Sequence, residues 1–559
     1  MRKKIIVLSA IAALTTASFA STEVEDRLSE MEAKIKKLEK KLKKSNKKLN
    51  KVKAHDAGDN IKWGVDFRTA VDKIDYETAE GKEYGNDALL TNRLLLNMGY
   101  ATSENTIFKG ALSYHKVFGA APAAENGYPQ RGYGYDSFDW VNAQSANSDK
   151  MTVKEAYWLY MNDTFMGTDV SWTASVGRRP STNGLLVNMR NDTKAQSPLG
   201  HIIDVEFDGA SFKFGLDKVT GIDGMSWKLC LGRGLSNATP RFDMSGGLDS
   251  KGDYSEDDAA LDTIDLAGFI FVPYDDGQYS VSTNMFKANN LPGFEMVDMT
   301  GAMSSTVTNT GMMKFIDSDE NNISDSWAFN ENVGMKTIGD LSGAAISFKA
   351  DGIGDGINDF LDDTTFFASW AQSKTNPDNN SMTMDMNAVY TMVAQSAQTS
   401  DIESTEFKTA FENAMSAMAS GDMDAPMKES GMLGSTKSET GTSIYMGVQM
   451  PCLLTEDGRI GVEYNKGSKY WRSFTYAEDT MAGSKLATRG SAWEVYYIKP
   501  LNEALRFEVR YTSISYDYTG SQAFFGDDGT PMTMAEAKSF GMDPIEKATD
   551  LRASITYRF

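Results

Sequence analysis

The sequence predicts an all-β protein, a large antiparallel transmembrane β-barrel of about 16–18 strands preceded by a short α-helical coiled coil. Three observations lead to this prediction. Apolar and polar side chains alternate with a period of two in segment after segment of residues 61–559. The last nine residues alternate without a break and end on Phe559. An apolar run too short to span a membrane as a helix stands close to the N-terminus.

Residues 1–20 are predicted to be a signal peptide. Three basic residues at positions 2–4 precede the apolar run 5–14, and Ser18 and Ala20 place small residues three and one positions before a cut after Ala20. The segment resembles a bacterial secretory signal. We therefore expect the mature chain to be exported into the cell envelope.

Residues 21–53 are predicted to form a Lys-rich coiled coil, followed by a linker at 54–60. Apolar side chains alternate at spacings of four and three from Val24 to Val52, with Ser45 as the one polar exception. Thr22 and Glu25 form a capping box at the start of the helix. This pattern predicts self-association. The basic side chains either form a solvated surface or contact an anionic partner such as peptidoglycan.

The barrel is predicted to span 61–559. Between 505 and 511, Leu, Phe, Val and Tyr share one face of a strand and Arg506, Glu508 and Arg510 share the other. A soluble β-sandwich also alternates, but its two faces would be a dry core and a solvated surface with mostly short loops. Charges opposite an aromatic-rich face, in strand after strand, favour a barrel with a lipid-facing exterior and a polar lumen.

The C-terminal strand carries a more specific signal. Residues 551–559 alternate perfectly and end on an aromatic residue. This closely resembles the last strand of bacterial outer-membrane barrels, and the resemblance gives Tyr557 and Phe559 a role in the membrane-assembly signal. It also implies that the protein lies in the bacterial outer membrane, among lipid and lipopolysaccharide, with the coiled coil in the periplasm.

Long loops take up much of the remaining chain, and four of them are acidic: 249–265, 317–325, 351–363 and 401–424. Such loops are either simply hydrated or hold divalent cations. Asp317 and Asp319 begin like a calcium-binding loop, but Asn322 and Ala328 stand where the required Gly and Glu would be, so no EF-hand is predicted. No cofactor is expected. The sequence leaves open whether Cys230 and Cys452 form a disulfide.

A long Met-rich, partly helical loop is predicted at 375–440. Phe407, Phe411, Met415 and Met418 recur at helical spacing after a capping box that begins at Ser400. The helix would pack its apolar stripe on the mouth of the barrel. Alternatively, the loop would fold into the lumen and constrict it.

A barrel of this size encloses an aqueous channel unless something fills it. Assigning alternate residues to the inner face gives basic side chains a modest majority there, despite a net charge of −21 for the chain. A basic constriction would favour anionic solutes, whereas charges that pair across the lumen would not. The predicted pore-lining residues are Arg68, Arg93, Lys109, Arg178, Arg179, Lys228, Arg506 and Arg510.

The combination of a coiled coil and a porin-like barrel resembles trimeric porins for phosphate, dicarboxylates and similar anions. It also resembles an uncharacterised porin-like family of bacterial outer-membrane proteins of unknown function. The resemblance implies a homotrimeric porin for passive diffusion of small hydrophilic solutes, with anions as the candidate class, and transfers no site residue by residue. The alternative is a structural outer-membrane protein that tethers the cell wall through its basic coiled coil.

Two further classes of function are disfavoured. An acidic chain is a poor binder of nucleic acid, because phosphate contacts need clustered Lys and Arg. No enzyme is predicted, since the three histidines, His55, His115 and His201, suggest no set of base, nucleophile and orienting group.

Overall fold

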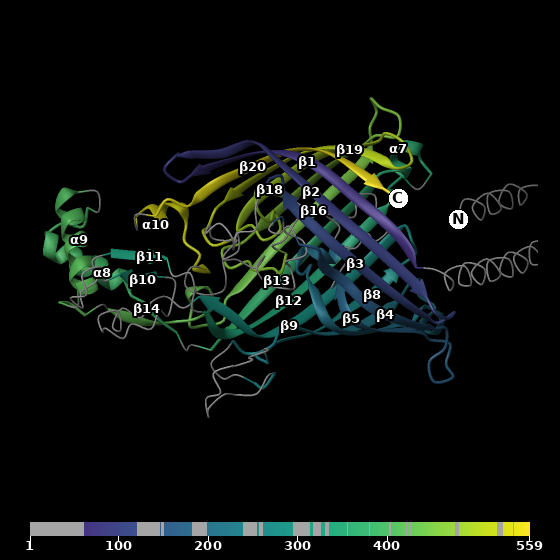
Figure 1. The fold of residues 1–559 in the computed structure, drawn as a ribbon, viewed down its shortest axis with the longest axis horizontal. Coiled ribbons are helices and arrows are strands. Elements are labelled where there is room, and N and C mark those ends of the chain that lie inside the picture. Colours follow the sequence, from purple (N-terminus) through teal and green to yellow (C-terminus); the bar gives the residue numbers. More distant parts are fainter. Residues whose placement is uncertain are drawn as a thin grey trace, which may run out of the picture. The chain divides into compact units, whose positions relative to one another are not determined.

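Figure 1 shows the computed structural model of the chain. One compact unit, residues 63–99 and 107–559, holds the barrel, and the other comprises 1–62 and 100–106. The predicted signal peptide, coiled coil and linker lie outside the described residues. The structure describes residues 61–119, 146, 150–180, 198–238, 254–256, 261–294, 313–316, 326–329, 335–354, 356–378, 381–401, 404–420, 422–424, 426–475, 480–521, 529–539 and 542–559.

Sixteen strands form a closed barrel, in which neighbouring strands follow one another in chain order and β20 closes on β1. This confirms the predicted fold class, at the lower end of the predicted strand number. The barrel strands are β1 (Lys62–Thr78), β2 (Glu83–Ala101), β3 (Thr106–Val117), β4 (Thr152–Asn162), β5 (Ser171–Pro180), β6 (Glu206–Gly215), β7 (Ser226–Leu235), β8 (Ile264–Asp275), β9 (Tyr279–Phe294), β12 (Met335–Asp351), β13 (Thr365–Pro377), β16 (Thr440–Pro451), β17 (Arg459–Gly467), β18 (Gly490–Pro500), β19 (Leu505–Tyr516) and β20 (Ile545–Arg558).

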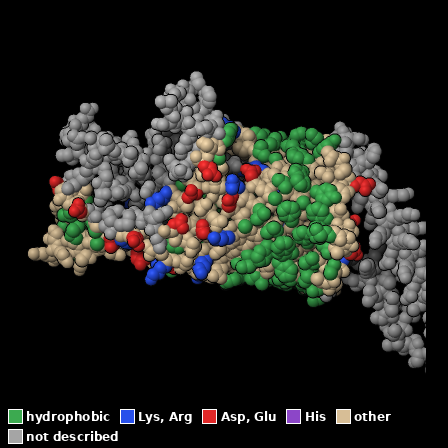
Figure 2. All heavy atoms as spheres, turned by 90° about the horizontal axis from the view of Figure 1, so that it is seen from below, with side chains coloured by type: hydrophobic (Ala, Val, Ile, Leu, Met, Phe, Trp, Pro, Cys, Tyr) green, Lys and Arg blue, Asp and Glu red, His purple; other side chains and the backbone are tan. Residues whose placement is uncertain are grey.

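Alternation along each strand separates an apolar outer face from a polar inner face. On β18, Trp493 and Val495 are 53% and 45% exposed, whereas Glu494 and Tyr496 are 0% and 1% exposed. Figure 2 shows the outward side chains gathered in a broad hydrophobic band on the barrel, with Lys, Arg, Asp and Glu outside that band. This is the surface of a barrel that spans a membrane, because lipid replaces water as the solvent of the outer face.

The C-terminal residues lie at the seam of the barrel. Tyr557 of β20 stands opposite Phe67 of β1. The Phe559 backbone N–H donates to the Val65 carbonyl at 2.9 Å, and the Val65 N–H donates to the Phe559 carbonyl at 3.1 Å. Both aromatic side chains point outward and are exposed. Their role in an assembly signal stays a prediction.

Shorter elements connect the strands. They are η2 (Pro198–His201), α6 (Asp217–Thr220), α7 (Asp359–Asp362), α8 (Met386–Ala397), α9 (Thr405–Ser420), η3 (Met432–Gly434), α10 (Met534–Ser539) and two hairpins, β10 (Met313–Ile316) with β11 (Ser326–Phe329) and β14 (Ser381–Met384) with β15 (Met427–Ser430). Among the described residues, no helix is long and apolar enough to cross a membrane.

The Met-rich insertion contains a helical hairpin with its own core. Val389 and Val393 of α8 are buried against Phe407 and Met418 of α9. The apolar stripe of α9 thus packs on α8. The prediction that it packs on the barrel mouth is wrong, because α8 supplies the apolar partner. The cap of α9 is Ser404, whose hydroxyl accepts a hydrogen bond from the Phe407 N–H at 3.2 Å. It lies four residues after the predicted capping position.

Inward-facing aromatic side chains lie over glycines of neighbouring strands. Phe286 covers Gly343, and Tyr496 covers Gly461, where an added Cβ would lie 2.0 Å from Tyr496 Cζ. Tyr496 is also held by the Gln449 side-chain amide, which donates to its hydroxyl at 3.2 Å. A side chain at position 461 would therefore displace a fixed ring.

Gly461→Leu is expected to lower the free energy of unfolding by about 1–3 kcal/mol, because overpacking pushes Tyr496 out of its position. The midpoint of guanidinium unfolding in detergent measures the effect. Gly99→Leu is the matched control, since a Cβ at Gly99 of β2 meets nothing within 4 Å. Equal midpoints for the two variants would contradict the packing argument.

Candidate functional site: the lumen of the barrel

In the part of the chain that the structure describes, the plug loop and the 198–205 segment fold into the lumen. The plug loop (468–475 and 480–489) connects β17 to β18, and the 198–205 segment leads into β6. They pair with each other: the Asp204 N–H donates to the Phe474 carbonyl and the Phe474 N–H donates to the Ile202 carbonyl, both at 2.9 Å. Together they bridge the interior of the barrel.

One side of the lumen is apolar. Ile202 and Ile203 of the 198–205 segment and Trp471 and Phe474 of the plug loop are buried in one hydrophobic cluster with inward-facing side chains of the wall. Residues Met432 and Leu433 of η3 join this cluster, so the end of the Met-rich insertion also enters it. The wall side chains are Phe207, Ile264, Leu266, Phe286, Ala288, Leu291, Ile338, Leu341, Ala345 and Ala371.

His201 anchors the 198–205 segment to the wall. Its ring is fully buried, with Nδ1 3.0 Å from the Ser369 hydroxyl of β13 and Nε2 2.9 Å from the Ser443 hydroxyl of β16. Burial lowers the pKa of His201 to about 3, so the imidazole is neutral at physiological pH. A neutral imidazole donates one of these hydrogen bonds and accepts the other.

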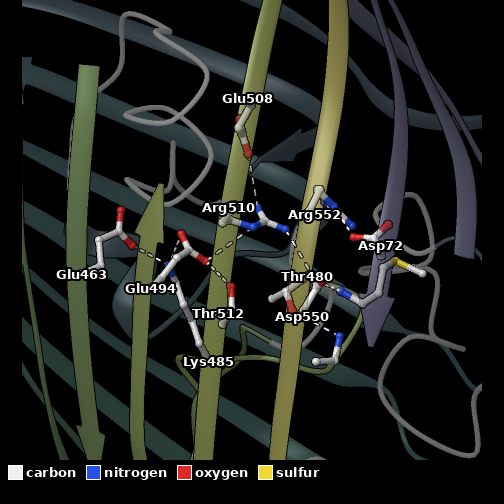
Figure 3. A network of polar contacts seen from close by, with 12 residues as sticks. Asp72, Glu463, Thr480, Lys485, Glu494, Glu508, Arg510, Thr512, Asp550 and Arg552 are labelled. Carbon is white, nitrogen blue, oxygen red and sulfur yellow. Dashed lines mark hydrogen bonds and ion pairs between the residues drawn. The ribbon is translucent and has the colours of Figure 1, made fainter. Parts of the chain in front are cut away.

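The other side of the lumen is charged. Lys485 of the plug loop inserts between Glu463 of β17 and Glu494 of β18, which stand opposite each other in register (Figure 3). Its Nζ lies 2.8 Å from Glu494 Oε1. The Tyr445 hydroxyl donates to Glu463 at 2.7 Å, and the Thr512 hydroxyl donates to Glu494 at 2.9 Å. All three charged side chains are buried, so each depends on the others for compensation.

Arg510 and Arg552 continue this network toward β1. The Arg510 guanidinium lies 3.7 Å from Glu494, 3.8 Å from Glu508 and 3.9 Å from Asp550. Arg552 pairs with Asp72 of β1. The plug loop takes part again through the Met481 N–H, which donates to Asp550 Oδ2 at 3.2 Å. Here the charges of the lumen are paired.

Two buried arginines tie the plug loop to the connection between β19 and β20. Arg472 donates to the carbonyls of Ser521 at 3.1 Å and Gly520 at 2.8 Å. Arg489 donates to the carbonyls of Thr519 at 2.9 Å and Gly529 at 3.0 Å. The plug loop is therefore fixed at its base, inside the lumen and against the neighbouring loop.

The predicted pore-lining residues lie in different environments in the structure: some are buried, some are ion-paired and some are exposed. Arg68 and Arg510 are buried on the inner face, and Arg506 lies on the same side of β19 as Arg510. Arg93 pairs with Asp66 at 3.4 Å. Lys109 is an exposed residue of β3.

The two adjacent arginines of β5 point to opposite faces of the strand. Arg178 lies 3.8 Å from Asp208, its register partner on β6. Arg179 points to the opposite face, because successive side chains alternate along a strand. There it lines a cavity together with Lys228. Of the eight predicted residues, these two are brought together.

Sequence reasoning missed Lys485, His201, Arg472 and Arg489, because none of them lies on an alternating strand. A signal was present in the plug loop: Trp471, Phe474 and Leu486 are large apolar side chains that a hydrated loop would expose to water. In the structure all three are buried.

No metal site is found in the part of the chain that the structure describes, where no group of three or more His, Cys, Asp and Glu side chains could hold an ion. Much of the acidic loops 249–265 and 317–325 lies outside that part, so divalent cations there stay a prediction. Cys230 and Cys452 are both free thiols.

Asp204 gives the docking of the 198–205 segment a pH dependence. Burial, and then repulsion from Glu206, raise the pKa of Asp204 to about 7, against an opposing effect of Lys154. The folded state therefore holds a proton that the unfolded chain releases near its pKa of 3.8, and this contribution to stability is lost as the pH rises toward 7. His201 acts in the opposite sense: its neutral form is favoured by folding, so stability falls as the pH drops below 6.5.

The difference in free energy of unfolding between Asp204→Asn and the original protein is expected to shift by about 1–3 kcal/mol in favour of the variant as the pH rises from 4.5 to 8, because the amide carries no charge to bury. Melting temperatures of both proteins in detergent across this range test the prediction. Asp208→Asn, at an exposed carboxylate four residues away, is the control. A constant difference between the D204N and original melting temperatures at all pH values would contradict the role of Asp204.

Comparison with known proteins places the chain in a family. Among solved structures it is similar to an anion-selective porin from Comamonas acidovorans, at 10% identity over 89% of this chain and 99% of that one, with a TM-score of 0.39. It is similar to OprB from Pseudomonas putida at 9% identity over 91% and 96% of the two chains, with a TM-score of 0.40. No match is found among curated proteins. The family model described as "Protein of unknown function (DUF3373)" matches residues 83–559, and the chain belongs to this family.

Proposed function

We propose that the protein is an outer-membrane channel for the passive diffusion of small hydrophilic solutes, with a preference for anions. The observation that carries the proposal is the polar inner face of the barrel. Charged and hydroxyl side chains face inward along strand after strand, opposite the apolar band that faces lipid. The plug loop and the 198–205 segment then narrow the channel to a path along the remaining wall.

The preference for anions follows from where positive charge is left over. The charges on β16 to β1 pair with one another, as Lys485 and Arg510 do. On β5 and β7, Arg179 and Lys228 make no ion pair with any described residue. A solute that passes this wall meets a net positive field, which attracts anions.

The location and assembly belong to the same proposal. The predicted signal peptide, the lipid-facing band and the terminal Phe559 support the outer membrane, with lipid and lipopolysaccharide as neighbours. The heptads of 21–53 support self-association, as a homotrimer, with the basic surface near peptidoglycan in the periplasm. Sedimentation in detergent should give a trimer for the full mature chain and a smaller species for a chain that lacks 21–53; equal species would contradict the role of the coiled coil.

Planar-bilayer recordings of the purified, detergent-solubilised protein test the channel. Stepwise currents are expected, with a reversal potential in a KCl gradient that has the sign for chloride. Deleting 386–420 is the matched control: the hairpin of α8 and α9 has its own core, so its loss should leave the step size unchanged. A reversal potential of the opposite sign would exclude anion preference.

The filled lumen specifically favours a second candidate, a closed barrel that serves as a structural link between outer membrane and cell wall. The hydrophobic cluster around Trp471 and Phe474 is what a permanently closed interior would contain. No current from folded protein, with or without the plug loop, would select this function.

A further inference from the structure

A small cavity lies on the inner side of the wall formed by β5 to β9. Its volume is about 70 Å³, which is room for a single small ion. Arg179, Ser211, Lys228 and Asn284 contribute polar groups, and Ile203 of the 198–205 segment lines it from the lumen side. No Asp or Glu is among the lining residues.

The Arg179 guanidinium is held in place with part of its hydrogen-bonding capacity unused. Its Nη1 contacts the hydroxyls of Ser175 and Ser211, and its Cζ lies 4.8 Å from the centroid of the Tyr157 ring. These partners orient the group but do not neutralise it. Its Nε is buried and has no hydrogen-bond partner in the described part of the chain.

The nearby carboxylates are engaged elsewhere. Glu206 pairs with Lys154. Glu155 attracts Lys109 and Lys154 as well as Arg179, and forms no ion pair with Arg179 within 4 Å in the described residues. Lys228 has no hydrogen bond or ion pair with any described residue. The cavity thus contains two cationic groups without a matching anion, an arrangement that a bound anion would stabilise.

We infer that this cavity binds a small oxyanion, such as inorganic phosphate or a carboxylate, between Arg179 and Lys228. A guanidinium presents parallel N–H donors that match two oxygens of one oxyanion, and Lys228 supplies a second positive charge. The Ser211 hydroxyl and the Asn284 amide add neutral donors. The inference rests on the proposed function in that it names the class of solute held in the channel, but binding does not require conductance.

Isothermal titration calorimetry on the full mature protein in detergent tests the site, with inorganic phosphate, acetate and chloride as probes. We expect phosphate and acetate to bind with Kd of about 1 mM, and chloride more weakly. Arg179→Gln and Lys228→Gln should each weaken binding at least tenfold, and Arg179→Lys less than Arg179→Gln. Arg233→Gln is the matched control on β7, because Arg233 is exposed and pairs with Asp265 at 2.8 Å.

The outcomes separate this site from the channel. Oxyanion binding without conductance would support the binding site and exclude the proposed channel function. Equal affinity in R179Q, K228Q and the original protein, or no binding of either oxyanion, overturns the site whatever the conductance. Protein refolded without lipopolysaccharide distinguishes the sources of the anion: unchanged phosphate binding identifies free anion, whereas binding of lipopolysaccharide in place of phosphate overturns the assignment to a free solute.

Discussion

Replacing residues 468–489 with a short Gly-Ser turn is expected to raise the single-channel conductance about threefold or more, because the described residues of the plug loop occupy the lumen. The strand ends permit the replacement. Lys466 of β17 stands opposite Ser491 of β18, so a hairpin turn can join the strands directly. The measurement is the step size in planar bilayers, beside the original protein and the 386–420 deletion.

Replacing the plug loop also exposes Glu463 and Glu494, which then face water in the enlarged lumen. Solvation replaces Lys485 as their stabilising partner, so the barrel should still form. Circular dichroism and a melting curve establish that it has done so. Step sizes equal to those of the original protein, from folded deletion variant, would show that the plug loop does not limit the current.

Lys485→Met is expected to destabilise the barrel by about 3–5 kcal/mol, because it leaves two carboxylates buried opposite each other without a cation. The midpoint of guanidinium unfolding in detergent measures this loss. Lys466→Met is the control, since Lys466 of β17 is exposed. A triple variant that adds Glu463→Gln and Glu494→Gln removes the unpaired charges and should recover most of the stability. If K485M were as stable as K466M, the lysine would not hold the plug loop in place.

The sequence predicts the barrel well because each strand lies between lipid and a polar interior. Its apolar side chains must face the lipid and its polar side chains the interior, so alternation shows which residues lie on each face. Alternation alone places Glu508 and Arg510 on the same face of their strand, and both side chains are buried inside the barrel. Residues 551–559, which end on Phe559, resemble the last strand of outer-membrane barrels, and in the structure residues 551–558 belong to β20, which pairs with β1.

The interior of the lumen could not be predicted in this way. Alternation places Arg510 inside but contains no information about its distance from Glu494 and Asp550, which come from other strands. Nor does it reveal that Lys485 enters from a loop to neutralise two carboxylates. A count of inward charges therefore describes composition, while selectivity depends on which charges remain unpaired.

The hydrophobic cluster inside the barrel has a consequence for how this protein can change over generations. In an open water-filled barrel, inward positions tolerate exchange among polar residues, and the lipid-facing surface carries most of the constraint. Here Leu341 and Ala371 point inward into close-packed surroundings, so their strands are constrained on both faces. Related chains that keep a filled lumen should therefore show little drift at these inward positions, and paired compensating exchanges between the wall and the plug loop.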